Sequence, residues 1–263
     1  MQRKYLQNGL ISALAFFCVG ARVMRGSDNS ALSLVTEVSA VATSNSAVAT
    51  DKVNGDALSS KITGALEALT SAVRPLSHPK ALETAFQSYF AYLNAHPTDV
   101  KKPLLYFVDY GLPSTQPRGY VFNMSTLQIV EGPFTVAHGR GSSTTQYGVP
   151  TRFSNSSGSA MTSLGLYLTQ GLYGFTGHTA GQIYNSVGLR LQGVSRGFND
   201  NAGARGVVAH GAPYVTATRA GRSEGCPAME QDRARRVLPE LANGGMVFLF
   251  APNAGLRADA QGV

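Results

Sequence analysis

The part of the chain after Lys102 contains a series of short apolar segments, and this series limits the fold more than any other feature. The segments have the length of strands and are separated by connections rich in Gly, Ser and Asn, such as 139–143 and 153–158. Strands are therefore expected at 104–108, 119–124, 127–138, 163–169, 187–194, 206–210 and 246–250, and one helix from about 231 to 241. The sequence predicts a mainly β fold with flanking helices.

Two amphipathic helices are expected ahead of these strands. Apolar residues recur at helical spacing over 58–73 and again over 82–93, and a proline follows each pattern, at Pro75 and Pro97. The expected division is a helical N-terminal segment at 57–97, a main domain at 98–253 and a tail at 254–263.

The N-terminus has the layout of a secretory signal. Basic residues precede an apolar stretch at 10–21, and small residues before Arg22 offer a cleavage site. The stretch is shorter than the roughly 20 residues that span a bilayer comfortably. We therefore expect 1–21 to be a signal peptide, or an uncleaved anchor in contact with the membrane, on a protein exported to the periplasm or cell envelope. Residues 22–56, rich in Ser, Thr and Ala, are expected to form a flexible linker.

The charge pattern argues against nucleic acid as a partner. The net charge is +7, but Lys and Arg are scattered and form no basic run interleaved with aromatic residues. A mild positive charge is compatible with ordinary solubility and with attraction to an anionic cell-wall polymer. No metal or other cofactor is expected, because neither His138 nor His178 has a Cys, His or carboxylate at ligand spacing.

Cys226 is expected to be the one thiol of the mature chain, since Cys18 lies in the apolar N-terminal stretch. Exported proteins normally pair their cysteines, so an unpaired cysteine there needs a chemical reason. His210 ends an expected strand sixteen residues earlier and is a candidate acceptor for the thiol proton. Spacing alone leaves two interpretations open, a nucleophile with its base or a buried thiol with a core histidine.

The turn before Cys226 suits an oxyanion site. Ser223 and Gly225 are small enough to let backbone N–H groups approach a carbonyl oxygen, and Gly211 is expected to support the site beside His210. Pro227 has no N–H, so the donors are expected to precede it.

Six short motifs together resemble one family. They are Val136–Gly139, Phe153–Asn155, Ser163–Gly165, Asn199–Ala202, His210–Ala212 and Gly221–Ala228, and they extend over nearly all of 103–252. The pattern resembles the YkuD-type cysteine L,D-transpeptidases, and within them the murein L,D-transpeptidase catalytic domain proteins. The resemblance implies a YkuD-like β fold and peptidoglycan stem peptides as substrate.

The resemblance also implies a mechanism. Cys226 would attack the stem tetrapeptide after its third, diamino-acid residue and release D-Ala, with His210 as base and then acid. An amine would resolve the thioester to form a 3→3 cross-link or exchange the terminal residue. The alternatives are an L,D-carboxypeptidase or related cysteine hydrolase, in which water resolves the thioester, and a non-catalytic peptidoglycan-binding module.

The candidate substrate contacts are Arg222, His138, His178, Tyr173 and Tyr214. Arg222 has paired donors that suit a stem-peptide carboxylate, although an arginine on the surface is also compatible with the sequence. Glu224 departs from the commonest form of the family motif, which has His at this position. We expect it to be exposed to solvent, with orientation of His210 as the alternative.

Overall fold

The computed structural model describes residues 55–252 and 254–255. The expected signal or anchor at 1–21 lies outside the described residues, as does all but the last two residues of the expected linker. Those two residues, 55 and 56, are helical rather than extended. Within the described part of the chain, no helix combines the length and apolar character needed to cross a membrane.

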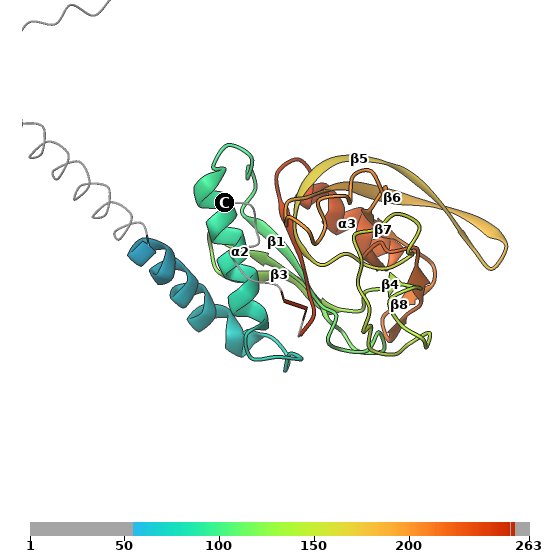
Figure 1. Ribbon diagram of the computed structural model, residues 1–263, viewed down its shortest axis with the longest axis horizontal. Helices are drawn as coiled ribbons and strands as arrows, with labels where there is room; N and C mark the ends of the chain where they lie inside the picture. Colours follow the sequence, from blue (N-terminus) through green and yellow to red (C-terminus); the bar gives the residue numbers. More distant parts are fainter. Residues whose placement is uncertain (1–54, 253, 256–263) are drawn as a thin grey trace, which may run out of the picture. The chain divides into compact units, whose positions relative to one another are not determined.

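A sheet of eight strands forms the centre of the molecule, in the order β11-β7-β6-β5-β12-β1-β2-β3 (Figure 1). Its strands are β1 (Leu104–Asp109), β2 (Gly119–Asn123), β3 (Gln128–Phe134), β5 (Gly165–Thr179), β6 (Gln182–Gly193), β7 (Val208–Gly211), β11 (Ala228–Met229) and β12 (Met246–Phe250). Neighbours are antiparallel except in the pairs β1–β12 and β7–β11, which are parallel. Two short pairs complete the β structure, β4 (His138–Gly139) with β10 (Arg222–Ser223) and β8 (Val215–Thr216) with β9 (Arg219–Ala220).

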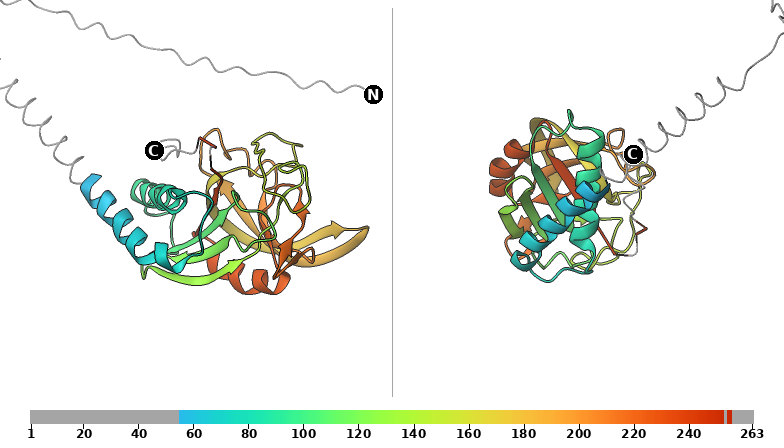
Figure 2. Two further views of the ribbon diagram at one scale, coloured as in Figure 1. Left: turned by 90° about the horizontal axis from the view of Figure 1, so that it is seen from below. Right: turned by 90° about the vertical axis from the view of Figure 1, so that its left-hand side faces the viewer.

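Helices cover the sheet. Residues 55–69 are helical and continue into η1 (Thr70–Ala72), and α2 (Ala81–Ala95) follows; α3 (Gln231–Leu241) lies apart from them (Figure 2). The predicted mainly β fold with two leading helices and one helix at 231–241 is therefore confirmed.

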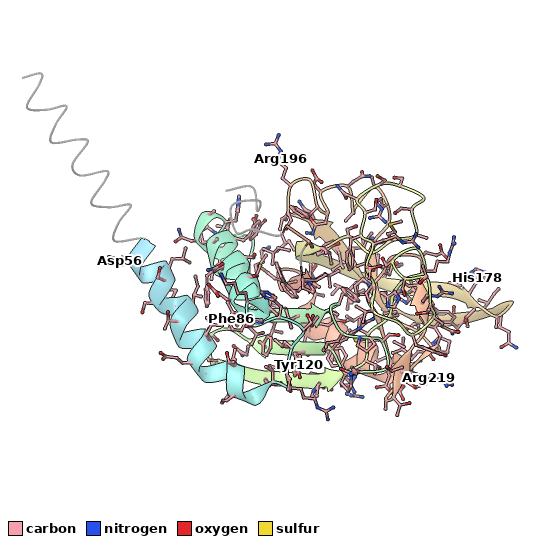
Figure 3. The ribbon with its side chains drawn as sticks, turned by 60° about the horizontal axis from the view of Figure 1, so that its bottom comes forward. Asp56, Phe86, Tyr120, His178, Arg196 and Arg219 are labelled. Carbon is pink, nitrogen blue, oxygen red and sulfur yellow. The ribbon has the colours of Figure 1, made fainter. Side chains whose placement is uncertain are left out.

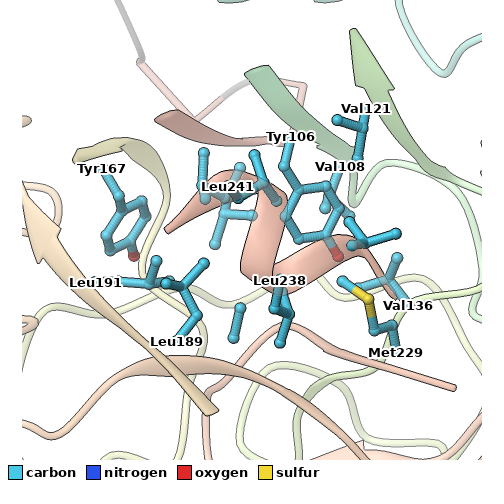
Figure 4. Close-up of a cluster of buried hydrophobic side chains, with 14 of the residues drawn as sticks. Tyr106, Val108, Val121, Val136, Tyr167, Leu189, Leu191, Met229, Leu238 and Leu241 are labelled. Carbon is cyan, nitrogen blue, oxygen red and sulfur yellow. The ribbon is translucent and has the colours of Figure 1, made fainter. Parts of the chain in front are cut away.

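Side chains alternate along β1, so both faces of the sheet bury apolar residues and both are covered by helices. Leu105 and Phe107 pack with the apolar side of α2, whereas Tyr106 and Val108 belong to the core beneath α3. Figure 4 shows Tyr106 and Val108 beside Leu238 and Leu241 of α3. Burial of one such large side chain stabilises the fold by about 1.5–3 kcal/mol, so the leading helices are part of the core.

Two strand predictions need correction. The strand expected at 127–138 is interrupted, because β3 ends at Phe134 and β4 begins at His138. The strands expected at 163–169 and 187–194 are much longer, and they join in a hairpin at Ala180 and Gly181, both with positive φ. Two central residues with positive φ match the twist of a two-residue hairpin turn. The hairpin projects beyond the rest of the sheet (Figure 1).

The hairpin was not expected from the sequence, because its glycines are typical of turns. In the structure they make room for rings. A Cβ at Gly177 would lie 2.4 Å from the Tyr184 ring, and one at Gly188 would lie 2.6 Å from the Tyr173 ring. The hairpin therefore carries aromatic side chains flat against its backbone, beside the strand that holds His210.

Candidate active site

Cys226 lies in the turn between β10 and β11, and the pairing of β11 fixes its position. β11 runs parallel to β7 with Ala228 opposite His210, so the residues before Ala228 pass along the start of β7. The thiol is free and half-buried. Burial raises the pKa of the Cys226 thiol, while the backbone amide of Val208 and the charge of Arg205 lower it.

His210 is held in one orientation by its own strand and by the hairpin. Its side chain is buried, and its Nδ1 atom lies 3.0 Å from the carbonyl oxygen of Gly211. A carbonyl only accepts hydrogen bonds, so Nδ1 carries the proton and Nε2 has the free lone pair. The imidazole also stacks on Phe175, with ring centroids 4.1 Å apart.

Burial lowers the pKa of His210 to about 4, whereas the hydrogen bond to the Gly211 carbonyl acts to raise it. The imidazole is therefore neutral at pH 7 and able to accept a proton. No hydrogen bond joins the side chains of His210 and Cys226 in residues 55–252. Catalytic hydrogen bonds often tighten only when substrate is bound, and the β7–β11 pairing holds the turn that precedes β11, with Cys226, beside β7.

Ser223 stabilises the turn that carries the thiol. Its Oγ donates to the carbonyl oxygen of Cys226 at 2.7 Å and accepts from the N–H of Gly225 at 3.1 Å. This corrects the expectation that the Gly225 amide is a free oxyanion donor, because that N–H is already paired. The N–H of Cys226 itself has no acceptor within the described part of the chain.

The position of Gly225 leaves no space for a side chain. Its φ is +129°, and a Cβ there would lie 2.8 Å from the carbonyl oxygen of Met161. Gly211 is equally confined, since a Cβ would lie 2.4 Å from Ser186 Oγ. Both glycines therefore permit close packing around the thiol and the imidazole.

His138 does not line an open cleft, which corrects its expected role as a substrate contact. It has no exposed surface, and its Nδ1 accepts a hydrogen bond of 2.9 Å from Nη2 of Arg118, itself fully buried. Burial, together with the charges of Arg118 and Arg222, lowers the pKa of His138 to about 3. His138 therefore belongs to a buried polar cluster behind β4.

The other candidate contacts differ in their exposure. Tyr173 and Tyr214 are half-buried, and burial raises the pKa of both, with the charge of Cys226 contributing in each case. Arg222 is half-buried in β10, and its Nη1 lies 3.4 Å from the carbonyl oxygen of Ser143. His178, by contrast, is exposed on the projecting hairpin (Figure 3).

Glu224 is exposed, as expected. Its side chain is 71% accessible and forms an ion pair of 2.7 Å with Arg140. It forms no hydrogen bond to His210 within residues 55–252, so the alternative in which it orients the imidazole is not what the structure shows. An exposed pair of this kind contributes little to stability.

Sequence reasoning missed Phe175 and Arg205. Phe175 lies in the hairpin that was interpreted as a loop, and only its alternation with Tyr173 signals a shared face. Arg205 lies in a loop and makes its contacts with residues more than 40 positions away, so no local pattern marks it.

No metal site accompanies this arrangement in the described residues, which contain no suitable group of three or more His, Cys, Asp or Glu. A cavity of about 490 Å³ lies between η1 and α2, lined by Arg74, His78 and their neighbours. It is on the helical side and does not include Cys226, so it is separate from the thiol and imidazole.

The fold and site define a class, a sheet-centred domain with a free thiol in the turn before β11 and a buried histidine on the neighbouring strand β7. Residues 75–250 match the family model of the L,D-transpeptidase catalytic domain. The match covers more than half of the chain, which therefore belongs to the L,D-transpeptidase catalytic domain family and has the predicted YkuD-like fold.

Solved structures of L,D-transpeptidases are similar to the chain at low identity. The one from Mycobacterium smegmatis is 13% identical, with 57% of this chain and 59% of that chain covered and a TM-score of 0.34. The one from Stackebrandtia nassauensis is 15% identical, with 67% of this chain and 69% of that chain covered and a TM-score of 0.36. The one from Xylanimonas cellulosilytica is 14% identical, with 61% of this chain and 68% of that chain covered and a TM-score of 0.33. The chain thus spans less than two thirds of the first of these. A comparison with curated proteins finds no match.

Proposed function

We propose that this protein is a peptidoglycan L,D-transpeptidase that acts through a thioester at Cys226. The observation that carries the proposal is the state of His210. Its Nδ1 lies 3.0 Å from the Gly211 carbonyl oxygen, which leaves the Nε2 lone pair as the proton acceptor, and β7 runs beside the turn that carries the thiol. A neutral imidazole in this position is the general base that a neutral thiol needs.

In the first half-reaction the sulfur of Cys226 bonds to the carbonyl carbon of the third residue of a stem tetrapeptide. The thiol proton passes to Nε2 of His210, and the carbonyl electron pair moves to oxygen. Because the N–H of Cys226 is unpaired, it is the donor we assign to this developing oxyanion. When the carbonyl re-forms, the C–N bond breaks and His210 returns its proton to the nitrogen of the leaving D-Ala.

In the second half-reaction the acceptor opens the thioester. The side-chain amine of another stem forms a C–N bond to the thioester carbon, and His210 takes a proton from that amine. When the carbonyl re-forms, the C–S bond breaks and His210 returns the proton to the sulfur of Cys226, with a 3→3 cross-link as product. A free amine gives an exchanged terminal residue. Tyr173 and Tyr214 are assigned to binding the stem peptide because both interact electrostatically with Cys226, and Arg222 is assigned to its carboxylate because its guanidinium suits that anion.

The proposal places the protein outside the cytoplasm, where its substrate lies. Residues 1–21 would direct export to the periplasm or cell envelope, and 22–56 would separate the domain from the membrane. Water as acceptor would make the protein an L,D-carboxypeptidase, and loss of turnover would leave a peptidoglycan-binding module. The same experiment separates these three outcomes.

The test is incubation of the purified protein with disaccharide tetrapeptide, followed by quantification of free D-Ala and of dimeric products. D-Ala release with 3→3 dimers supports the transpeptidase. Release without dimers, at every amine concentration, identifies the carboxypeptidase. Sacculus binding without release, equal in the wild type and in Cys226→Ala, identifies the binding module and overturns catalysis.

A further inference from the structure

Arg205 lies behind the turn of Cys226 and comes from the loop between β6 and β7. Its own N–H donates to the carbonyl oxygen of Asn201 at 3.0 Å, and Val207 N–H donates to that of Ala202 at 3.0 Å. These bonds fix the backbone immediately before β7, the strand that carries His210. Arg205 is therefore placed by the same backbone that places the imidazole.

The guanidinium of Arg205 holds a loop that is distant in sequence. Nη1 donates to the carbonyl oxygen of Ser154 at 2.7 Å and to Ser163 Oγ. Nη2 donates to the carbonyl oxygen of Met161 at 2.7 Å and to Ser159 Oγ at 3.3 Å. All four acceptors are neutral, and no ion pair involving Arg205 occurs in residues 55–252 and 254–255.

The turn that carries Cys226 packs against the loop that Arg205 binds. A Cβ at Gly225 would lie 2.8 Å from the carbonyl oxygen of Met161 and 3.6 Å from Nη2 of Arg205. Gly225 thus packs against the same carbonyl that Arg205 holds, and its lack of a side chain lets the cation come close. The charge of Arg205 also acts on the thiol, because it lowers the pKa of Cys226, whereas burial and the carboxylate of Glu224 raise it.

We propose that Arg205 is a positioning residue that holds the Met161 carbonyl beneath Gly225 and, as a cation without an ion pair, stabilises the thiolate of Cys226. The inference rests on the proposed function only in assigning the thiolate a role in acyl transfer. When the thiol proton moves to His210, the thiolate is an anion in a half-buried place. A nearby cation stabilises this anion more strongly when the cation is not paired with a carboxylate.

The experiment measures alkylation of Cys226 by iodoacetamide against pH, since only the thiolate reacts. Arg205→Gln is expected to react about tenfold more slowly at pH 7 and to move the whole profile to higher pH. Arg205→Lys keeps the charge and is expected to recover most of the rate. Arg196→Gln removes an exposed arginine and is expected to match the wild type (Figure 3). A wild-type profile in folded Arg205→Gln would overturn the proposal.

A second pair of variants serves if Arg205→Gln does not fold. Ser159→Asp places a carboxylate beside Nη2 of Arg205, whereas Ser159→Asn has the same shape without the charge. The Asp variant is expected to alkylate more slowly than the Asn variant, and equal profiles would overturn the proposal. Iodoacetamide needs no stem peptide, so absence of transpeptidation would overturn the proposed function and leave this result standing.

Discussion

The imidazole of His210 stacks on the ring of Phe175 across a strand that separates them. Phe175 is on β5 and His210 on β7, and the ring centroids are 4.1 Å apart with the planes inclined by 20°. The residue of β6 opposite His210 is Gly188, which has no side chain to hold the rings apart. A Cβ there would lie 3.1 Å from the Cβ of Phe175.

Phe175→Ala is expected to lower kcat about tenfold and to let the pKa of His210 rise from about 4, because the ring shields the imidazole from water. The stack contributes about 0.5–1.5 kcal/mol, so folding should survive. NMR titration of His210 and turnover of disaccharide tetrapeptide measure the two effects. Leu172→Ala, an exposed change on the same strand, is the control. Equal turnover in both variants would contradict a role for the stack.

Gly225→Ala is expected to reduce both stability and acylation, because the new Cβ would meet the Met161 carbonyl oxygen at 2.8 Å. Gly158→Ala is the matched control. Gly158 also has positive φ, +73°, but a Cβ there would have no neighbour within 4 Å. The control should lose only the backbone cost of about 1–2 kcal/mol in chemical unfolding. If both variants retain equal acylation rates, the close packing of the turn is not required.

Two buried histidines predict a loss of stability in mild acid. The pKa values of His138 and His210 are about 3 and about 4 in the folded protein and about 6.5 in the unfolded chain. Below pH 6.5 the unfolded state therefore binds protons that the folded state does not, and the free energy of unfolding falls. From pH 7 to pH 5 each histidine should lower the free energy of unfolding by about 2 kcal/mol.

Urea unfolding at pH 7, 6 and 5 measures this dependence. His138→Gln keeps an acceptor for Arg118. This variant should reduce the pH dependence of the free energy of unfolding by about the contribution of one histidine. His178→Gln, which removes an exposed histidine on the hairpin, is the matched control. An unchanged slope in folded His138→Gln would contradict the neutral, buried state of His138.

The strands that could be predicted are those whose apolar pattern is uninterrupted. The predicted bounds of β12 and α3 agree with the structure, because β12 is a continuous apolar run buried at every position and α3 has amphipathic spacing. The hairpin of β5 and β6 could not be predicted, since its glycines serve the packing of rings rather than turns. That use of glycine depends on contacts between strands, which a local pattern does not contain.

The family of the site could be predicted from the sequence, but the residues that support the site could not. The spacing of His210 and Cys226 leaves a nucleophile with its base and a buried thiol both open, and the surrounding motifs indicate the family. The burial of His138 against Arg118 and the contacts of Arg205 with the loop at 154–163 arise from tertiary structure. These contacts join residues 20 or more positions apart, so no spacing in the sequence identifies them.

The central claim is that Cys226 forms a thioester with the stem peptide, and intact-mass measurement tests it most directly. The purified protein is incubated with disaccharide tetrapeptide beside Cys226→Ala, with native folding of the variant checked by circular dichroism. We predict an adduct on the wild type of the mass of the substrate less D-Ala, sensitive to hydroxylamine and absent from the variant. An adduct that persists in Cys226→Ala, or D-Ala release by that variant at the wild-type rate, would contradict the account.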